Sequence, residues 1–136
     1  MRTNILTSDA QAQLTPDTVL SNLKSGNSNY TAANLTAVDI NDLRAASVYG
    51  QAPKAIVLSC IDSRVVVEEV FDQALGDIFV ARVAGNFVNT DIVASMEYAC
   101  KVAGSKLIVV LGHEGCGAVK AAVSYTHLTL PTNGLV

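Results

Sequence analysis

Three residues that could bind a metal ion follow two short apolar runs of the sequence. The run AIVLS leads directly to Cys60, and the later run LIVVL leads to GHEGC, which contains His113 and Cys116. Two thiolates and one imidazole form a ligand set that suits zinc. Cys60 can complete this set only if the two runs are neighbouring strands. Three protein ligands leave a fourth tetrahedral position open, which is typical of catalytic rather than structural zinc.

Two charged residues follow Cys60 closely, at Asp62 and Arg64. An aspartate beside a zinc thiolate could orient water at the metal, or it could bind zinc as a fourth ligand and close the site. Arg64 can hold Asp62 in a bidentate ion pair, which keeps the carboxylate ionised and away from the metal. In the second loop, Gly115 and Gly117 add no side chains and leave backbone N–H groups able to face an anion.

Each of these patterns also has an ordinary structural explanation. A cysteine that ends a buried strand is usually a small core residue, and a single His-x-x-Cys is weak evidence for a metal. An Asp-x-Arg pair is usually a solvated turn, and Glu114 is expected to be an exposed loop carboxylate. Cys100 has no partner at ligand spacing and is expected in the core, and His127 is given no role. As unconnected patterns, they support a zinc site and an ordinary core about equally.

Composition indicates one domain and excludes several classes of function. The chain has 136 residues, of which half are hydrophobic, so it can form a core without disulfides. A formal net charge of −3 gives no basic patch for nucleic acid. No apolar run reaches the ~18 residues that span a membrane. The three cysteines are odd in number, and the N-terminus shows no signal-peptide pattern, so we expect a cytoplasmic protein.

Alternating strand and helix patterns predict an α/β fold with a parallel-sheet core flanked by helices. The expected strands cover residues 55–58, 78–83 and 107–111, and the expected helices cover residues 65–71, 91–103 and 118–123. The inward face of the helix 91–103 is expected to carry Ile92, Met96, Ala99 and Val102 or Ala103. Because sites in open α/β sheets form beyond the carboxyl ends of the strands, both cysteine-bearing loops should lie at one edge.

Residues 1–50 predict an N-terminal helical arm. A first helix should begin at Thr15 as N-cap with Pro16 at its first position, and Gly26 with Asn27 should end it. A weaker helix is expected over residues 38–48. Its inward residues should be Val38, Leu43 and Ala46. Neither helix can form a core alone, so both should lie on another surface, such as that of another subunit.

The last stretch, residues 124–136 (SYTHLTLPTNGLV), interrupts the strand–helix pattern because Thr and Pro occur where a helix should continue. We therefore expect residues 1–136 to form a single, incomplete domain that is truncated and carries a foreign or misread tail. A three-stranded sheet that stops here should leave an apolar edge and one face poorly covered.

Two motifs carry a resemblance to a known family. CIDSRV (60–65) and GHEGCGAV (112–119) resemble the two zinc-site signatures of the beta-class carbonic anhydrases. Four further segments resemble parts of that family: LTPDTVLSNLKSGN (14–27), GQAP (50–53), FDQALGDIFVARVAGN (71–86) and SMEYAC (95–100). The resemblance covers about residues 14–123, and both motifs occur in order at compatible spacing.

The resemblance implies a chemistry for the metal site. It implies Zn²⁺ bound by Cys60, His113 and Cys116, with Asp62 and Arg64 acting as a catalytic dyad. The implied reaction is the reversible hydration of carbon dioxide to bicarbonate and a proton. Two alternatives remain open: a related zinc hydrolase that acts on carbonyl sulfide or carbon disulfide, and a non-catalytic zinc-binding fragment.

The resemblance also implies an assembly. Gln51 would contribute a polar side chain, and Phe79 an apolar wall, to a substrate pocket that spans a dimer interface. Gly117 would offer a backbone N–H near the reacting oxygen. The N-terminal helices would wrap around the partner, so a homodimer or homotetramer is expected, with no nucleic acid or membrane as partner.

Overall fold

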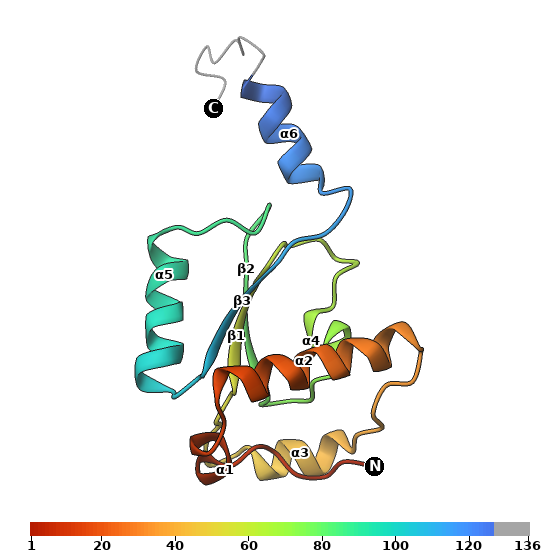
Figure 1. Cartoon of the computed structure of the whole chain (residues 1–136), viewed down its shortest axis with the longest axis vertical. Helices are drawn as coiled ribbons and strands as arrows, with labels where there is room; N and C mark the ends of the chain where they lie inside the picture. Colours follow the sequence, from red (N-terminus) through yellow and green to blue (C-terminus); the bar gives the residue numbers. More distant parts are fainter. Residues whose placement is uncertain (127–136) are drawn as a thin grey trace.

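The computed structural model describes residues 1–126 and is organised around a three-stranded parallel sheet (Figure 1). The strands β1 (Ala55–Ser59), β2 (Ile78–Arg82) and β3 (Leu107–Leu111) lie in the order β2-β1-β3. All five residues of the central strand β1 are buried, which explains its unbroken apolar run. The register pairs Ser59 with both Arg82 and Leu111, so the three strands end at one edge. The predicted strands and α/β class are confirmed.

Helices cover both faces of the sheet (Figure 1). Helix α5 (Thr90–Glu97) continues into a π-helical turn, η1 (Tyr98–Val102). Asn89 caps α5, because its side chain accepts the backbone N–H of Ile92 at 2.9 Å. On the face of the sheet beneath α5 and η1, Ile56 and Leu58 of β1 form an apolar cluster with Met96 and Ala99 of the helical segment.

The opposite face is covered by α2 (Pro16–Thr31), whose Val19 and Leu23 are buried against Ala55. Helix α2 thus packs on the sheet of its own chain, and contact of the N-terminal arm with a partner stays a prediction. The remaining helices are α1 (Ser8–Ala12), α3 (Ile40–Ala46), α4 (Val67–Val70) and α6 (Gly117–Thr126). Helix α6 extends away from the sheet beyond the end of β3 (Figure 1).

The start of α2 is as predicted, but its predicted end is wrong. Thr15 forms a capping box with Thr18, in which each side chain accepts the other residue's backbone N–H. The helix does not stop at Gly26 or Asn27 and instead runs to Thr31. Gly26 is buried in mid-helix, where a β-carbon would lie 1.8 Å from the backbone oxygen of Phe71. A close approach of two backbones, and not a helix end, requires this glycine.

Two of the three inward positions predicted for the second arm helix are also wrong. Only Leu43 is fully buried, whereas Val38 is 40% exposed and Ala46 is exposed. Asp39 caps α3 with its side chain, so the helix begins after Val38. Val38 instead forms an isolated parallel bridge with Arg2. Ala46 is the last residue of this seven-residue helix.

The helix predicted over 91–103 is confirmed in extent, but after Glu97 it is π-helical. In η1 the N–H of Ala103 reaches the carbonyl of Tyr98, five residues earlier. This wider turn changes the phase of the side chains. Met96 and Ala99 are buried and Ile92 packs against them, as predicted. Of the two alternatives for the last inward position, Val102 is 69% exposed and Ala103 is half-buried.

One face of the edge strand β3 is poorly covered, as the sequence predicted. Ile108 and Val110 are 46% and 59% exposed. They are the register neighbours of Ile56 and Leu58, which α5 and η1 bury. Within residues 1–126, the helix layer on this face therefore ends before β3.

No helix within residues 1–126 combines the length and the apolar character needed to cross a bilayer.

The contact at Gly26 generates a stability prediction. Alanine at position 26 should gain about 1 kcal/mol of helix propensity. It should also introduce an overlap with the Phe71 carbonyl that no rotamer change can relieve, and such overpacking costs about 1–3 kcal/mol or more. We expect Gly26→Ala to lower the free energy of unfolding, measured by denaturant titration. Ser21→Ala, on the exposed side of the same helix, is the matched control and should be neutral or slightly stabilising. Equal or greater stability of Gly26→Ala would contradict the packing.

Candidate metal centre

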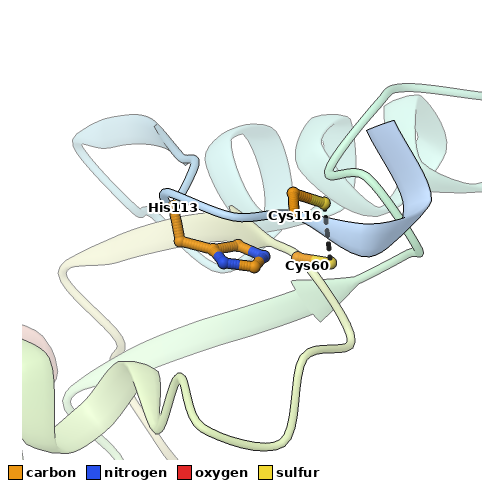
Figure 2. Close-up of side chains that lie close together, drawn as sticks. All are labelled: Cys60, His113 and Cys116. Atoms are coloured by element: carbon orange, nitrogen blue, oxygen red, sulfur yellow. Dashed lines mark hydrogen bonds between the residues drawn. The ribbon is translucent and has the colours of Figure 1, made fainter. Parts of the chain in front are cut away.

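The carboxyl ends of β1 and β3 bring the three predicted ligands together (Figure 2). The ligand atoms of Cys60, His113 and Cys116 all lie within 4.8 Å of one another. The two sulfur atoms are 3.8 Å apart. Zn–S bonds of ~2.3 Å at a tetrahedral angle place two sulfurs about 3.8 Å apart. The sequence prediction that the two apolar runs are neighbouring strands is confirmed.

The orientation of His113 favours metal binding through Nε2. Its Nδ1 lies 3.0 Å from the backbone oxygen of Glu114, so an Nδ1–H donates there and leaves the Nε2 lone pair unprotonated. Nε2 is buried and has no hydrogen-bond partner among the described residues. The ring points toward the two cysteines (Figure 2). A buried, unpartnered nitrogen is costly in an apo protein, and a metal ion would satisfy it.

The donor set fits zinc. Cys60 and Cys116 are buried free cysteines, and their 3.8 Å separation is far longer than an S–S bond. Soft sulfur donors with one imidazole nitrogen select zinc over hard cations such as Mg²⁺ or Ca²⁺. The three residues leave room for a fourth donor, as in catalytic centres.

Asp62 lies beside the ligand group and is held by Arg64, as predicted. Arg64 Nε donates to Oδ1 at 2.9 Å and Nη2 donates to Oδ2 at 2.7 Å, while the backbone N–H of Arg64 adds a third bond at 3.0 Å. These bonds hold the pKa of Asp62 well below its usual range. Asp62 Oδ2 is 3.8 Å from His113 Nε2. The carboxylate is thus ionised and engaged by Arg64 next to the centre.

The Cys60 sulfur is poised as a thiolate by groups around it. The backbone N–H of Gly85 donates to Sγ at 3.3 Å, and this bond, with the neighbouring His113, lowers the pKa of Cys60 to about 6. The same sulfur raises the pKa of His113. Gly85 adopts a φ of +83°, a left-handed conformation that favours glycine.

Arg82 and Gly85 are contacts of the centre that the sequence reasoning missed. Arg82 donates from Nε to the backbone oxygen of Cys60 at 2.8 Å and from Nη2 to that of Asp62 at 2.6 Å. In the sequence, Arg82 lies within an ordinary predicted strand and Gly85 lies just after it. The feature that brings Arg82 to the centre is its pairing with Ser59, which only the sheet register reveals.

The other predicted site residues fall in three places. Gly117 follows Cys116 directly and begins α6 next to the candidate metal ligands. Phe79 on β2 packs its ring edge-on against Tyr98, with ring centroids 6.4 Å apart, in an apolar groove between β2 and α5. Gln51 precedes β1, is exposed, and lines a separate shallow pocket near the N-terminal segment. One chain therefore brings Gly117 to the metal ligands but does not bring Gln51 to them.

Three further residues, Glu114, Cys100 and His127, had been given no role in the site. Glu114 is exposed, as expected. Cys100 is half-buried in η1 rather than in the core, because the π turn changes its facing. His127 and most of the stretch 124–136 lie outside the described residues, although α6 continues regularly to Thr126.

The structure thus combines a parallel α/β sheet with a Cys–His–Cys group at the carboxyl edge of that sheet. The sequence model of the family described as "Carbonic anhydrase" matches residues 55–134, which is more than half of the chain. The chain belongs to the carbonic anhydrase family, in its beta class. The match reaches into the stretch 124–136.

Relatives and solved structures agree with this membership. Carbonic anhydrase 2 of Mycobacterium tuberculosis is 46% identical over 103 residues, which are 75% of this chain and 50% of the relative. The beta-carbonic anhydrase CcaA superposes with a TM-score of 0.61 at 30% identity, covering 82% of this chain and 54% of CcaA. A structure from Sordaria macrospora, one of two tetrameric beta-carbonic anhydrases, gives 0.58 at 29% identity, covering 79% and 54%. The chain spans about half the length of the curated relatives it matches.

The environment of Cys60 generates a prediction for the metal-free protein. Because the pKa of Cys60 is lowered to about 6, its proton should leave as the pH rises through about 6, and the thiolate should dominate at neutral pH. After chelation, the ultraviolet absorbance of thiolate should show this step, and Cys60→Ser should remove it. Cys100→Ser is the matched control and should keep it. A wild-type step found only in the ordinary range of cysteine would contradict the prediction.

Proposed function

We propose that this chain carries the zinc centre of a beta-class carbonic anhydrase that hydrates carbon dioxide reversibly to bicarbonate and a proton. The observation that carries the proposal is the buried, unpartnered Nε2 of His113 beside two cysteine sulfurs 3.8 Å apart. Membership of the carbonic anhydrase family supports the reaction.

Each residue at the centre has a proposed task. Cys60, His113 and Cys116 would hold the metal, and the two thiolates would offset its double positive charge. Bound zinc would lower the pKa of water enough for it to add to carbon dioxide near neutral pH. Asp62 would accept a hydrogen bond from the reacting water and so orient its lone pair toward the substrate.

Asp62 could instead bind the metal as a fourth ligand and close the site. That arrangement would need at least one carboxylate oxygen to be released from the bidentate contact with Arg64. The observed pairing therefore favours the open arrangement, in which Arg64 keeps Asp62 available to water.

The substrate pocket is proposed to need a second copy of the chain. Gln51 is exposed and away from the ligands of its own chain, so its side chain is available to another copy. Phe79 would form an apolar wall for the small, uncharged substrate, and Gly117 would offer its N–H to the product anion. We propose a homodimer, or a homotetramer built from it.

The cytoplasm is the proposed compartment. None of Cys60, Cys100 and Cys116 forms a disulfide, although two of the sulfurs lie close together. Free thiols are typical of reducing compartments.

The proposed reaction predicts how ligand and dyad variants separate. Cys60→Ser and His113→Ala should lose both zinc, measured by elemental analysis, and carbon dioxide hydration, measured by stopped flow. Asp62→Asn should retain zinc but lose at least about tenfold in rate, because it acts on the reacting water and not as a ligand. Cys100→Ser is the control and should retain both.

Other outcomes would change the proposal. A wild-type chain with a full complement of zinc and no hydration activity would support the alternative that the chain is a non-catalytic zinc-binding fragment. Hydrolysis of carbonyl sulfide or carbon disulfide without hydration of carbon dioxide would indicate the related hydrolase. Activity retained by His113→Ala would contradict the centre itself.

The shared pocket predicts complementation between two inactive variants. If Gln51 serves the partner's pocket, a hybrid of Gln51→Ala and Asp62→Asn subunits contains one pocket with both intact residues. Mixing the two variants under conditions of subunit exchange should therefore restore up to about a quarter of the wild-type rate for random pairing into dimers. Light scattering on the same sample gives the mass of the assembly. No recovery in a dimer shown to exchange its subunits would place Gln51 in its own chain's pocket or outside any pocket.

A further inference from the structure

The segment that carries Cys60 and Asp62 leaves the sheet just before the metal centre. The backbone N–H of Val83 donates to the oxygen of Ser59 at 3.1 Å. In a continuing parallel ladder, the N–H of Gly85 would next meet a backbone oxygen of the β1 strand. Here it donates to the Cys60 sulfur at 3.3 Å. The backbone ladder between β2 and the β1 strand therefore ends at Ser59.

The guanidinium of Arg82 joins the end of β2 to the segment that follows β1. Cys60 and Asp62 are two residues apart, so in an extended segment their backbone oxygens point the same way. Arg82 donates Nε to the first at 2.8 Å and Nη2 to the second at 2.6 Å. A single planar fork thereby fixes two alternate peptide groups, one at a metal ligand and one at the proposed orienting carboxylate.

We propose that Arg82 is a positioning residue that sets the geometry of the metal centre by holding the 60–62 backbone against the end of β2. This inference rests on the proposed zinc centre. With both oxygens fixed, the Cys60 sulfur stays 3.8 Å from that of Cys116 and the Asp62 carboxylate stays within reach of Arg64. Arg82 touches neither the ligand atoms nor the carboxylate, so its effect reaches the centre only through the backbone.

The side-chain chemistry of arginine is required for this task. The two donors of the fork are separated and coplanar, and both stay charged. A lysine ammonium could meet one oxygen, but its single nitrogen cannot hold both at the same geometry. Because Arg82 is exposed, water can solvate the two oxygens when the side chain is removed. The main loss should therefore be in the geometry of the centre and not in folding.

The test measures zinc affinity directly, by competition with a chromophoric chelator. We expect Arg82→Met to bind zinc about 10–100-fold more weakly than wild type, the usual effect of removing a group that positions a metal ligand. Arg82→Lys should fall between the two. Arg44→Met removes the same charge from an exposed position of α3 and should bind zinc as wild type does. In cobalt-substituted protein, the visible and thiolate charge-transfer bands should shift for Arg82→Met and not for Arg44→Met.

Unfolding curves and the CO2 assay separate this inference from its alternatives. Equal zinc affinity and an unchanged cobalt spectrum in folded Arg82→Met would overturn the positioning role. If Arg82→Met does not fold, Arg82→Lys decides: wild-type affinity and spectrum in that variant overturn the role, and weaker binding supports it. A wild-type chain that binds zinc without hydrating carbon dioxide would refute the proposed function, while the affinity series would still test Arg82.

Discussion

The parallel pairing of β1 with β3 is the constraint on which the metal centre depends. It places Ser59 opposite Leu111, so Cys60 and the loop that holds His113 and Cys116 leave the sheet side by side. A shift of one residue in this register would move the Cys60 backbone by about 3.3 Å and reverse its facing. Metal sites tolerate ligand displacements of only about 0.2 Å. The packing that fixes the register, which includes Ile56 and Leu58 in the core, therefore also fixes the site.

The groups around the ligands also solve an electrostatic problem. Two cysteines with an aspartate nearby bring three potential negative charges to one edge of the sheet. Positive and N–H groups face them from separate elements: Arg64 binds the carboxylate, the Gly85 N–H binds the Cys60 sulfur, and Arg82 binds the backbone between them. The bonds from Gly85 and Arg64 stabilise the ionised forms of Cys60 and Asp62, and those from Arg82 hold the backbone between them. The centre is arranged for a cation before any metal is bound.

The helices bury both faces of the central strand but leave part of β3 exposed. Helix α2 covers one face of the sheet and approaches the Phe71 backbone at the end of α4 closely enough to require Gly26, while α5 with η1 buries the opposite face. That layer does not reach β3, whose Ile108 and Val110 stay exposed within residues 1–126. The three proposed metal ligands lie within these residues, which span about half the length of the matched relatives. Ligand geometry and coverage of the sheet are thus separate properties of the fold.

The sequence by itself determined the three strands, the start of α2 and the candidate ligand set, because unbroken apolar runs, capping residues and cysteine and histidine are local signals. It also anticipated the Asp62–Arg64 pair, since two residues of spacing suffice for that contact. It failed where distant backbones meet, because Gly26 resembles a helix end but lies against the backbone of Phe71. The roles of Arg82 and Gly85 depend on which residues of β2 face the end of β1. Only the tertiary structure decides this, because strand register is set by packing across the whole sheet and not by neighbours along the chain.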